Sequence, residues 1–347
     1  MVERLTNTLL APYTTLGVGG PADSLAITQT YDETLDVLHT TDEPLWFLGY
    51  GSNCLISDEG LRGTTILWRG GEISREGAML TVDAGVLWDD LVRTTIDHQL
   101  WGFELMSEIP STVGGAVFGN IAAYGQQVSD TLQWVEVYDT NSKQMHTLQH
   151  DDITFAYRQS SLQSEPHRKI LRAGFKLSTT PLHALKYDSA LAIADELKLD
   201  PSKLEECRKI IVETRTRAGS IYHYDDPNAE RTAGSFFKNP LVSIEQAKMV
   251  AGFDETGKTL DRIINQSKIH GGNAQRASAA HVLLAAGFHR GQTWGNVRLH
   301  PHHVLKIETL PGATAQEVYD VTQLILETVK DKLDITLEPE VKFLGNF

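Results

Sequence analysis

The stretch TAGSFFKNP, residues 232–240, places one hydroxyl, that of Ser235, between a glycine and two phenylalanines. Glycine lets the backbone turn tightly and come close to a ligand, and the aromatic rings can limit the access of water. A serine held in this way could deliver a single proton to a reacting atom. The alternative is an apolar turn in which the hydroxyl only caps the backbone.

Two other segments carry charges that suit catalysis. FAYRQSS places Arg158 after two aromatic residues, where its planar guanidinium could contact a carboxylate or an enolate. LEPEVKF puts Glu338 and Glu340 on the same side of an extended segment, and Pro339 between them suits the end or edge of a sheet. Taken singly, each of these charges is also typical of a surface side chain.

Two glycine-rich segments could hold a ligand through their backbone. GYGSN (49–53) follows an apolar strand, and its glycines allow positive φ angles and N–H groups that face a phosphate. IPSTVGGAVFGNIAAYG (109–125) is too apolar for a solvated linker, and a ligand rich in acceptors would satisfy its backbone groups. A tight turn and a bend in a sheet are the alternatives. Because G-x-G-x-x-G is missing, a Rossmann dinucleotide site is not predicted.

Two further motifs are weak indicators of their usual functions. GFDETGKT (252–259) fits the phosphate-loop pattern G-x-x-x-x-G-K-[ST], but the preceding SIEQAKMVA is typical of a helix rather than a strand. The histidines of LHPHH (299–303) are more closely spaced than zinc ligands usually are. We therefore expect a surface turn and loop histidines, and no metal.

Composition and charge narrow the class of protein. The chain has 347 residues and a formal net charge of -14, which disfavours nucleic acid or anionic lipid as the main partner. Cys54 and Cys207 form no CxxC pair, so we expect free thiols and a cytoplasmic protein. We expect no membrane span and no signal peptide. The oligomeric state stays open, with a monomer favoured.

The residue patterns around these segments predict a chain of mixed helices and strands, an α+β fold, in which strands dominate the first half. Within 45–53 a strand is expected that stops at the glycines, and further strands rich in β-branched and aromatic residues are expected at 64–69, 80–85, 132–139 and 170–177. Helices are expected at 87–98, 200–217 and 314–333, the second beginning at Asp200 as N-cap and ending with Arg215 and Arg217. A last strand over 334–345 completes the pattern.

The segments LGYGSN, IPSTVGGAVFGNIAAYG, FAYRQSS, AGSFFKNP and LEPEVKF, in this order, resemble the UDP-N-acetylenolpyruvoylglucosamine reductases of peptidoglycan synthesis, a flavoprotein family. LKYDSAL (185–191) is similar to the tyrosine loop of the longer subtype. The resemblance implies an α+β fold with a two-lobed FAD-binding domain of the vanillyl-alcohol-oxidase (PCMH) type and a C-terminal α+β substrate-binding domain. The resemblance implies that residues 1–68 and 334–347 form the first FAD-binding lobe and that residues 69–217 form the second. Residues 218–333 form the implied substrate-binding domain.

The resemblance also implies a reaction. One FAD, bound non-covalently, takes hydride from NADPH and passes it to the enolpyruvyl group of a UDP-sugar, which becomes UDP-N-acetylmuramate. Arg158 would stabilise the enolate, Glu340 would hydrogen-bond its carboxylate, and Ser235 would donate the proton. The implied substrate-binding residues are Tyr187, Lys238, Asn239 and Arg290. The implied flavin-binding residues are Gly49, Tyr50, Gly51, Ser52, Asn53, Cys54, Ile109, Pro110, Ser111, Gly114, Gly115, Asn120, Ala123, Tyr124 and Gly125.

The chain departs from the usual family pattern in its substrate-binding segments. AGSIYHYDDP (218–227) lacks the usual lysine, and LLAAGFHR (283–290) has Arg290 where another lysine is usual. Ser111 and Gly119 also differ from the usual glycine and glutamine. Two alternatives therefore stay open. One is a flavin-dependent paralogue that acts on another sugar nucleotide, and the other is a non-catalytic sugar-nucleotide-binding protein.

Overall fold

The computed structural model describes residues 2–41, 44–222, 226, 229–254, 257–261, 264 and 275–347. The chain forms two compact units. The first comprises Met1–Thr8, Ala22–Gly51 and Arg62–Pro227, and the second comprises Leu9–Pro21, Ser52–Leu61 and Asn228–Phe347. Each unit has its own cluster of buried apolar side chains. The three segments expected from the sequence divide the chain at other points, and that division stays a prediction.

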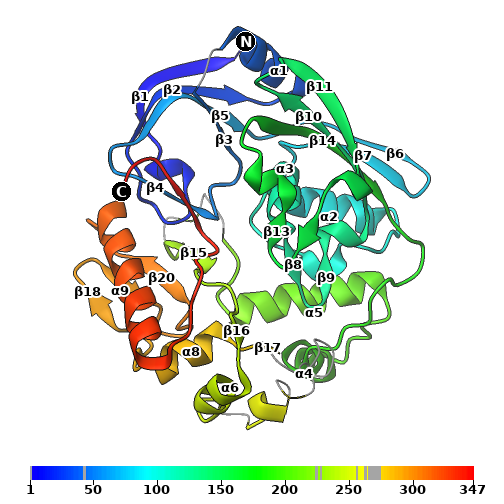
Figure 1. The fold of residues 1–347 in the computed structure, drawn as a ribbon. Helices are drawn as coiled ribbons and strands as arrows, with labels where there is room; N and C mark the ends of the chain where they lie inside the picture. Colours follow the sequence, from blue (N-terminus) through cyan, green and yellow to red (C-terminus); the bar gives the residue numbers. More distant parts are fainter. Residues whose placement is uncertain are drawn as a thin grey trace. The chain divides into compact units, whose positions relative to one another are not determined.

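Two sheets form the frame of the first unit (Figure 1). The four-stranded sheet has the order β1 (Glu3–Leu9), β2 (Pro21–Thr28), β5 (Leu61–Trp68), β3 (Leu45–Leu48), with β3 and β5 parallel. The antiparallel five-stranded sheet has the order β11 (Gln144–Gln149), β10 (Leu132–Asp139), β14 (Arg168–Lys176), β7 (Met79–Asp83), β6 (Ile73–Glu76). The strands predicted over the first half of the chain are therefore confirmed.

The first unit also contains helices. They are α1 (Tyr31–Thr40), α2 (Trp88–Asp97), α3 (Val113–Gly119), α4 (Asp188–Leu197) and α5 (Leu204–Arg217). Helix α3 contacts β14 and β7 of the five-stranded sheet and brings the glycine-rich segment against it (Figure 1). Short 3₁₀ turns of the first unit lie at Glu104–Met106, Val128–Asp130, His150–Asp152 and Ser161–Ser164, and one of the second unit lies at Ala11–Tyr13.

Helix α5 begins later than the sequence pattern predicts. Its N-cap is Lys203, and Asp200 does not cap it. Instead, the carboxylate of Asp200 accepts hydrogen bonds from the N–H and the hydroxyl of Ser202, at 2.9 and 2.7 Å. An aspartate that bonds the backbone two residues on stabilises a turn in competition with a helix, which explains why the predicted start was wrong.

The second unit is built on a sheet of the order β15 (Thr232–Ser235), β20 (Lys306–Thr309), β19 (Val297–Leu299), β18 (Thr293–Trp294). Two small pairs accompany it, β16 (Leu241–Val242) with β17 (Gln275–Arg276) and β21 (Lys342–Leu344) with β4 (Cys54–Ile56). Its helices include α6 (Ile244–Ala251), α8 (Ala279–Ala285) and α9 (Ala315–Leu333).

Helix α9 confirms the predicted apolar face, since Val318, Val321, Ile325 and Val329 are all buried. Its N-terminus has a capping box between Thr314 and the residue three positions later.

The last strand is shorter than predicted. Only Lys342–Leu344 form β21, which lies parallel to β4. Pro339 contributes an isolated bridge with Phe237, since a proline cannot donate to a continuous ladder. None of the helices in the part of the chain that the structure describes has the length and apolarity of a membrane crossing.

Candidate active site

The first unit places Arg158 at the tip of a β-hairpin. Strands β12 (Phe155–Ala156) and β13 (Gln159–Ser160) are antiparallel and are joined by Tyr157 and Arg158. Arg158 has a φ of 58°, in the left-handed region that side chains other than glycine seldom adopt. Its guanidinium Nη1 donates a hydrogen bond to the carbonyl oxygen of Ala122 at 2.7 Å. The hairpin thus fixes a cation on this unit.

Ala122 belongs to a second hairpin, in which β8 (Ala122–Ala123) and β9 (Gln126–Gln127) are antiparallel. Tyr124 and Gly125 join the strands with φ angles of 50° and 90°. Two successive positive φ angles are typical of the type I′ turn that closes a tight hairpin. No described atom lies within 4 Å of the Cβ that a side chain at Gly125 would add. The backbone of this turn is therefore accessible.

Asn120 joins helix α3 to the hairpin of Arg158 and to the turn that follows β9. It is buried and ends the helix as a left-handed C-cap, with a φ of 42°. Its Nδ2 donates to the carbonyl oxygen of Ala156 at 3.2 Å, and its Oδ1 accepts from the N–H of Ser129 at 3.1 Å. The side chain that the sequence assigned to flavin binding thus holds the frame of the site.

Arg215 is a cation of this region that the sequence analysis missed. Its Nη2 donates to the carbonyl oxygens of Glu108 and Ser220, at 3.1 and 2.8 Å. Its Nε is buried and has no hydrogen-bond partner among the described residues. Burial raises the pKa of the Tyr124 hydroxyl, and the charge of Arg215 opposes that rise. The charge of Arg215 therefore acts on the Tyr124 hydroxyl.

The sequence held a signal for Arg215. Arg215 and Arg217 are two positions apart on a helix, so they point to different sides of it. Arg217 pairs with Glu196 and Glu213 on the exposed side, at 2.8 and 2.7 Å. Arg215 lies on the other side of the helix, so its charge has a role beyond complementing the helix dipole.

The two glycine-rich segments of the first unit lie against each other. A Cβ at Gly49 would lie 2.8 Å from Oγ1 of Thr112, closer than real Cβ atoms come. Thr112 is the N-cap of α3, and its Oγ1 accepts from the N–H of Gly115 at 3.3 Å. The segment 109–125 thus contains a short helix, although the sequence pattern suggested a ligand-binding loop or a bend in a sheet.

The predicted flavin-binding residues divide between the units. Those in the first unit are Gly49, Tyr50, Gly51, Ile109, Pro110, Ser111, Gly114, Gly115, Asn120, Ala123, Tyr124 and Gly125, and those in the second are Ser52, Asn53 and Cys54. The donor set of the first unit, with the accessible turn at Gly125 and the unbonded Nε of Arg215, fits a cofactor rich in acceptors. Burial raises the pKa of the Cys54 thiol to about 12, so this thiol is a poor nucleophile near neutral pH.

The second unit places Ser235 at the end of strand β15. Gly234, directly before it, has a φ of 74°, and the pairing of β15 with β20 shifts register between Thr232 and Ser235. Ser235 is exposed, whereas Phe236 and Phe237 are 0% and 2% exposed. The left-handed glycine therefore presents the hydroxyl while the next two side chains enter the core.

Glu340 is held beside this segment by backbone hydrogen bonds. Its N–H donates to the carbonyl oxygen of Phe236 at 2.8 Å. Its own carbonyl oxygen accepts from Nδ2 of Asn53 at 3.2 Å, and the carbonyl of Asn53 accepts from the N–H of Lys342 at 3.0 Å. The second unit thus brings Ser235, Glu340 and Asn53 together from three distant parts of the sequence.

Two lysines accompany Glu340. Lys238, a predicted substrate residue, has a side chain that is only 11% exposed, with its Nζ 3.4 Å from a carboxylate oxygen of Glu338. Burial lowers the pKa of Lys342, and the charge of Lys238 lowers it further, while the carboxylates of Glu338 and Glu340 oppose both effects. The cluster thus pairs two ammonium groups with two carboxylates.

Comparison with known proteins decides the family. Family models described as "UDP-N-acetylenolpyruvoylglucosamine reductase, C-terminal domain" and "FAD binding domain" match residues 226–344 and 26–148. Proteins named UDP-N-acetylenolpyruvoylglucosamine reductase match from Tropheryma whipplei (33% identical, 96% of this chain and 97% of that protein) and Cutibacterium acnes (31%, 97% and 89%). The crystal structure of UDP-N-acetylenolpyruvylglucosamine reductase (MurB) from Thermus caldophilus matches with a TM-score of 0.65 and 26% identity over 99% of each chain. The chain belongs to this reductase family.

Membership of the reductase family confirms the predicted fold class, a mixed α+β chain with an FAD-binding domain and a distinct C-terminal domain. The FAD-binding match falls mainly in the first unit, and the C-terminal match falls mainly in the second. Each unit therefore corresponds mainly to one of the two matched domains. The sequence patterns alone did not give the boundary between the units.

The remaining predicted substrate residues of this chain have different surroundings. Asn239 contacts the start of helix α8, because its Oδ1 accepts from the N–H of Ala279 at 2.9 Å. Arg290 is exposed in the turn after that helix. Tyr187 is 51% exposed in the first unit, where its ring meets Tyr124 edge-on at 5.3 Å. These roles in substrate binding stay predictions.

The phosphate-loop pattern of this chain follows a helix, as predicted. Helix α6 precedes it, with a capping box at Ser243. Residues 255 and 256 of the pattern, and 223–225, 227 and 228 in and after the altered segment 218–227, lie outside the described residues. Among the residues that are described, no three of His, Cys, Asp or Glu are grouped to hold a metal ion.

Two of the histidines of LHPHH, His300 and His302, contact each other. His300 is buried, and its Nε2 lies 2.9 Å from a carboxylate oxygen of Glu230. Its Nδ1 accepts from the N–H of His302 at 3.1 Å, so the neutral ring carries its proton on Nε2. These contacts are with protein groups and agree with the expectation that the histidines belong to a loop.

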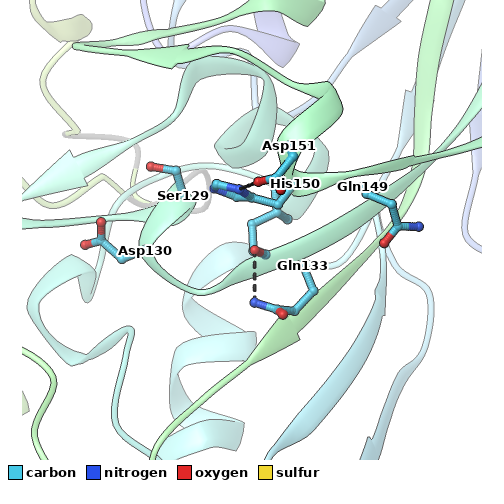
Figure 2. Close-up of a pocket in the computed structure, with 7 residues that line it drawn as sticks. Ser129, Asp130, Gln133, Gln149, His150 and Asp151 are labelled. Carbon is cyan, nitrogen blue, oxygen red and sulfur yellow. Dashed lines mark hydrogen bonds and ion pairs between the residues drawn. The ribbon is translucent and has the colours of Figure 1, made fainter.

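The first unit also has an open polar cavity of about 440 Å³, lined by Ser129, Asp130, Leu132, Gln133, Gln149, His150 and Asp151 (Figure 2). Figure 2 shows His150 bonded to Asp151, at 3.1 Å between Nδ1 and Oδ1. None of the predicted site residues lines this cavity. This cavity therefore carries no part of the site that the sequence predicts.

Proposed function

We propose that this chain reduces the enolpyruvyl group of UDP-N-acetylenolpyruvoylglucosamine to give UDP-N-acetylmuramate, with FAD as a non-covalent cofactor and NADPH as the reductant. The observation that carries the proposal is the arrangement around Ser235, where a left-handed glycine exposes the hydroxyl beside the backbone-held Glu340. Relatives over the whole chain bear the name of this activity.

The flavin supplies the hydride when it is bound, and the chain supplies binding, charge and a proton. We assign the flavin to the two glycine-rich segments because glycine at 49 permits the close approach to Thr112 and the turn at Gly125 leaves the backbone accessible. The raised pKa of Cys54 leaves that thiol protonated, which supports a non-covalent flavin.

Arg158 stabilises the negative charge that develops on the carboxylate and the carbon beside it. A guanidinium suits a planar carboxylate, because its N–H groups match both oxygens. Fixing the cation in advance, through the left-handed turn and the bond to Ala122, removes the cost of arranging it during the reaction.

Ser235 donates the proton that completes the reduction, and Glu340 hydrogen-bonds the substrate carboxylate. A proton donor must lie within hydrogen-bond reach of the receiving atom, which favours a short side chain on a fixed backbone. Ser235 is such a short side chain on a fixed backbone. The left-handed Gly234 sets the direction of its Cα–Cβ bond, and the buried Phe236 anchors the following residue in the core. We assign these roles to Ser235 and Glu340 on the basis of family membership.

A flavin-dependent paralogue that acts on another sugar nucleotide is the second candidate. The observation that favours it is Arg290, an exposed residue at a position where the family usually has lysine. The free thiols of Cys54 and Cys207 support a reducing compartment, and we propose a cytoplasmic location.

The test begins with the purified protein. It should be yellow, and acid precipitation should release the colour into the supernatant; a colourless protein or a yellow pellet contradicts the cofactor proposal. NADPH should bleach the flavin absorbance anaerobically, and the enolpyruvyl substrate should restore it. Recovery with another enolpyruvyl or unsaturated sugar nucleotide, but not with this one, would favour the paralogue.

A further inference from the structure

The hairpin that carries Arg158 is attached to helix α3 by side chains from the strand and turn that follow it. The carbonyl oxygen of Phe118, in the last turn of α3, accepts from Oγ of Ser160 at 2.7 Å and from Nε2 of Gln163 at 2.9 Å. Carbonyl groups in the last turn of a helix have no partner within the helix, so they readily accept such bonds.

Gln163 makes a second contact with the hairpin. Its Nε2 also lies 3.3 Å from the carbonyl oxygen of Arg158, and an amide NH₂ group has two hydrogens to donate. The preceding residue, Leu162, is 1% exposed and anchors the turn in the core of the first unit. One amide therefore joins the hairpin tip to the helix of the glycine-rich segment.

We propose that Gln163 is a positioning residue for Arg158. It holds the peptide after the left-handed residue, while the bond to Ala122 holds the guanidinium at the other end of the side chain. A left-handed backbone at a residue other than glycine is strained and persists only where its surroundings enforce it. Without the amide, the tip relaxes and the guanidinium moves away from the place where charge develops.

The inference rests on the proposed function, since it gives Gln163 an effect only on the step in which Arg158 acts. Gln163→Leu removes both donated hydrogen bonds at similar volume. We expect bleaching by NADPH to keep its rate within about twofold and recovery by the enolpyruvyl substrate to slow by about 10- to 100-fold, as for a misplaced catalytic group.

Two further variants separate positioning from general damage. Gln163→Lys keeps a donor on a side chain of similar reach, and it should restore most of the recovery rate. Gln159→Leu removes an exposed amide from the same hairpin and should behave as the wild type. Equal slowing of both steps by Gln163→Leu would contradict the inference.

The decisive measurement is a double-mutant cycle. In an Arg158→Ala background, Gln163→Leu should change the recovery rate by no more than about twofold, because the two residues act as one unit. The same loss in both backgrounds would overturn the proposal.

A readout that needs no substrate is hydrogen exchange in the peptide that covers residues 155–161. Exchange there should be faster in Gln163→Leu than in Gln163→Lys or Gln159→Leu. Unchanged exchange would also overturn the positioning role. If the wild-type protein failed to recover its colour with the enolpyruvyl substrate, the proposed function would fail, and this exchange measurement would still decide the role of Gln163.

Discussion

The hairpin of Arg158 in the first unit and the strand of Ser235 in the second position their side chains by different means. Arg158 is long, and contacts at several points hold it, from Ala122 at its head to the Asn120 side chain at its hairpin. Ser235 is short, and the backbone of β15 and the burial of Phe236 fix it. A long side chain needs partners along its length, whereas a short one needs only a fixed Cα.

The comparison predicts that the two regions fail in different ways. Changes around Arg158 should act through hydrogen bonds and backbone strain at the surface of the first unit. Changes around Ser235 should act either on the proton itself or on the core of the second unit.

The largest effect is expected from Ser235→Ala. Bleaching by NADPH should continue, and recovery by the enolpyruvyl substrate should slow by about 10²–10⁴-fold, because general acid catalysis contributes that much. Ser235→Cys should keep part of the rate, since a thiol can also donate a proton. Stopped-flow spectra of the two steps provide the measurement. If neither step slows, the hydroxyl only caps a turn, and the proton assignment is wrong.

Phe236→Ala should be the most destabilising change near Ser235. The ring is 0% exposed, and truncating a buried phenylalanine costs about 3–5 kcal/mol of unfolding free energy through lost contacts and a cavity. Phe253→Ala is the matched control, because that ring is 45% exposed, and it should cost under about 1 kcal/mol. Urea denaturation compares the two. Similar midpoints would show that core burial does not fix this strand.

Asn120→Ala tests the frame of the first unit. It removes the bonds to Ala156 and Ser129 and places alanine at a φ of 42°, for an expected cost of about 2 kcal/mol. Asn120→Gly tolerates the positive φ and should cost less. Thermal or urea unfolding of both variants checks the order. An equal loss in the two would mean that backbone strain at this position contributes nothing.

The smallest effect concerns pH and His303. Burial lowers the pKa of this ring, and the charges of Lys306, His300 and Arg290 lower it further. The unfolded chain binds this proton more tightly, so its contribution is complete above about pH 6.5 and is lost as the pH falls through the depressed pKa. His303→Gln should therefore flatten the decline of stability between about pH 7.5 and 5.5. An unchanged decline would assign it to other groups.

The sequence determined the periodic elements and the candidate chemistry. Helix α9 formed where Val318, Val321, Ile325 and Val329 recur at helical spacing, and the main strands formed where β-branched and aromatic residues cluster. The order of the glycine, arginine, serine and glutamate segments was also enough to indicate the family and its flavin.

Competing local interactions limited how accurately the ends of helices and strands could be predicted from the sequence. Asp200 stabilised a turn with Ser202 in place of the expected helix start, and Pro339 confined the last strand to Lys342–Leu344. Helix α3 escaped prediction because its glycines disfavour a helix, which here depends on the Thr112 cap and on packing against β14.

Only the tertiary structure decided what surrounds each side chain. The bond between Asn53 and Glu340 joins residues 287 positions apart, and those of Arg158 with Ala122 and Gln163 depend on how two hairpins meet α3. Local patterns record the preferences of a few neighbouring residues, whereas such bonds depend on the packing of whole units. The chemistry of this protein is therefore legible in its sequence, while the positions of its charges follow from the energies of packing and hydrogen bonding across the fold.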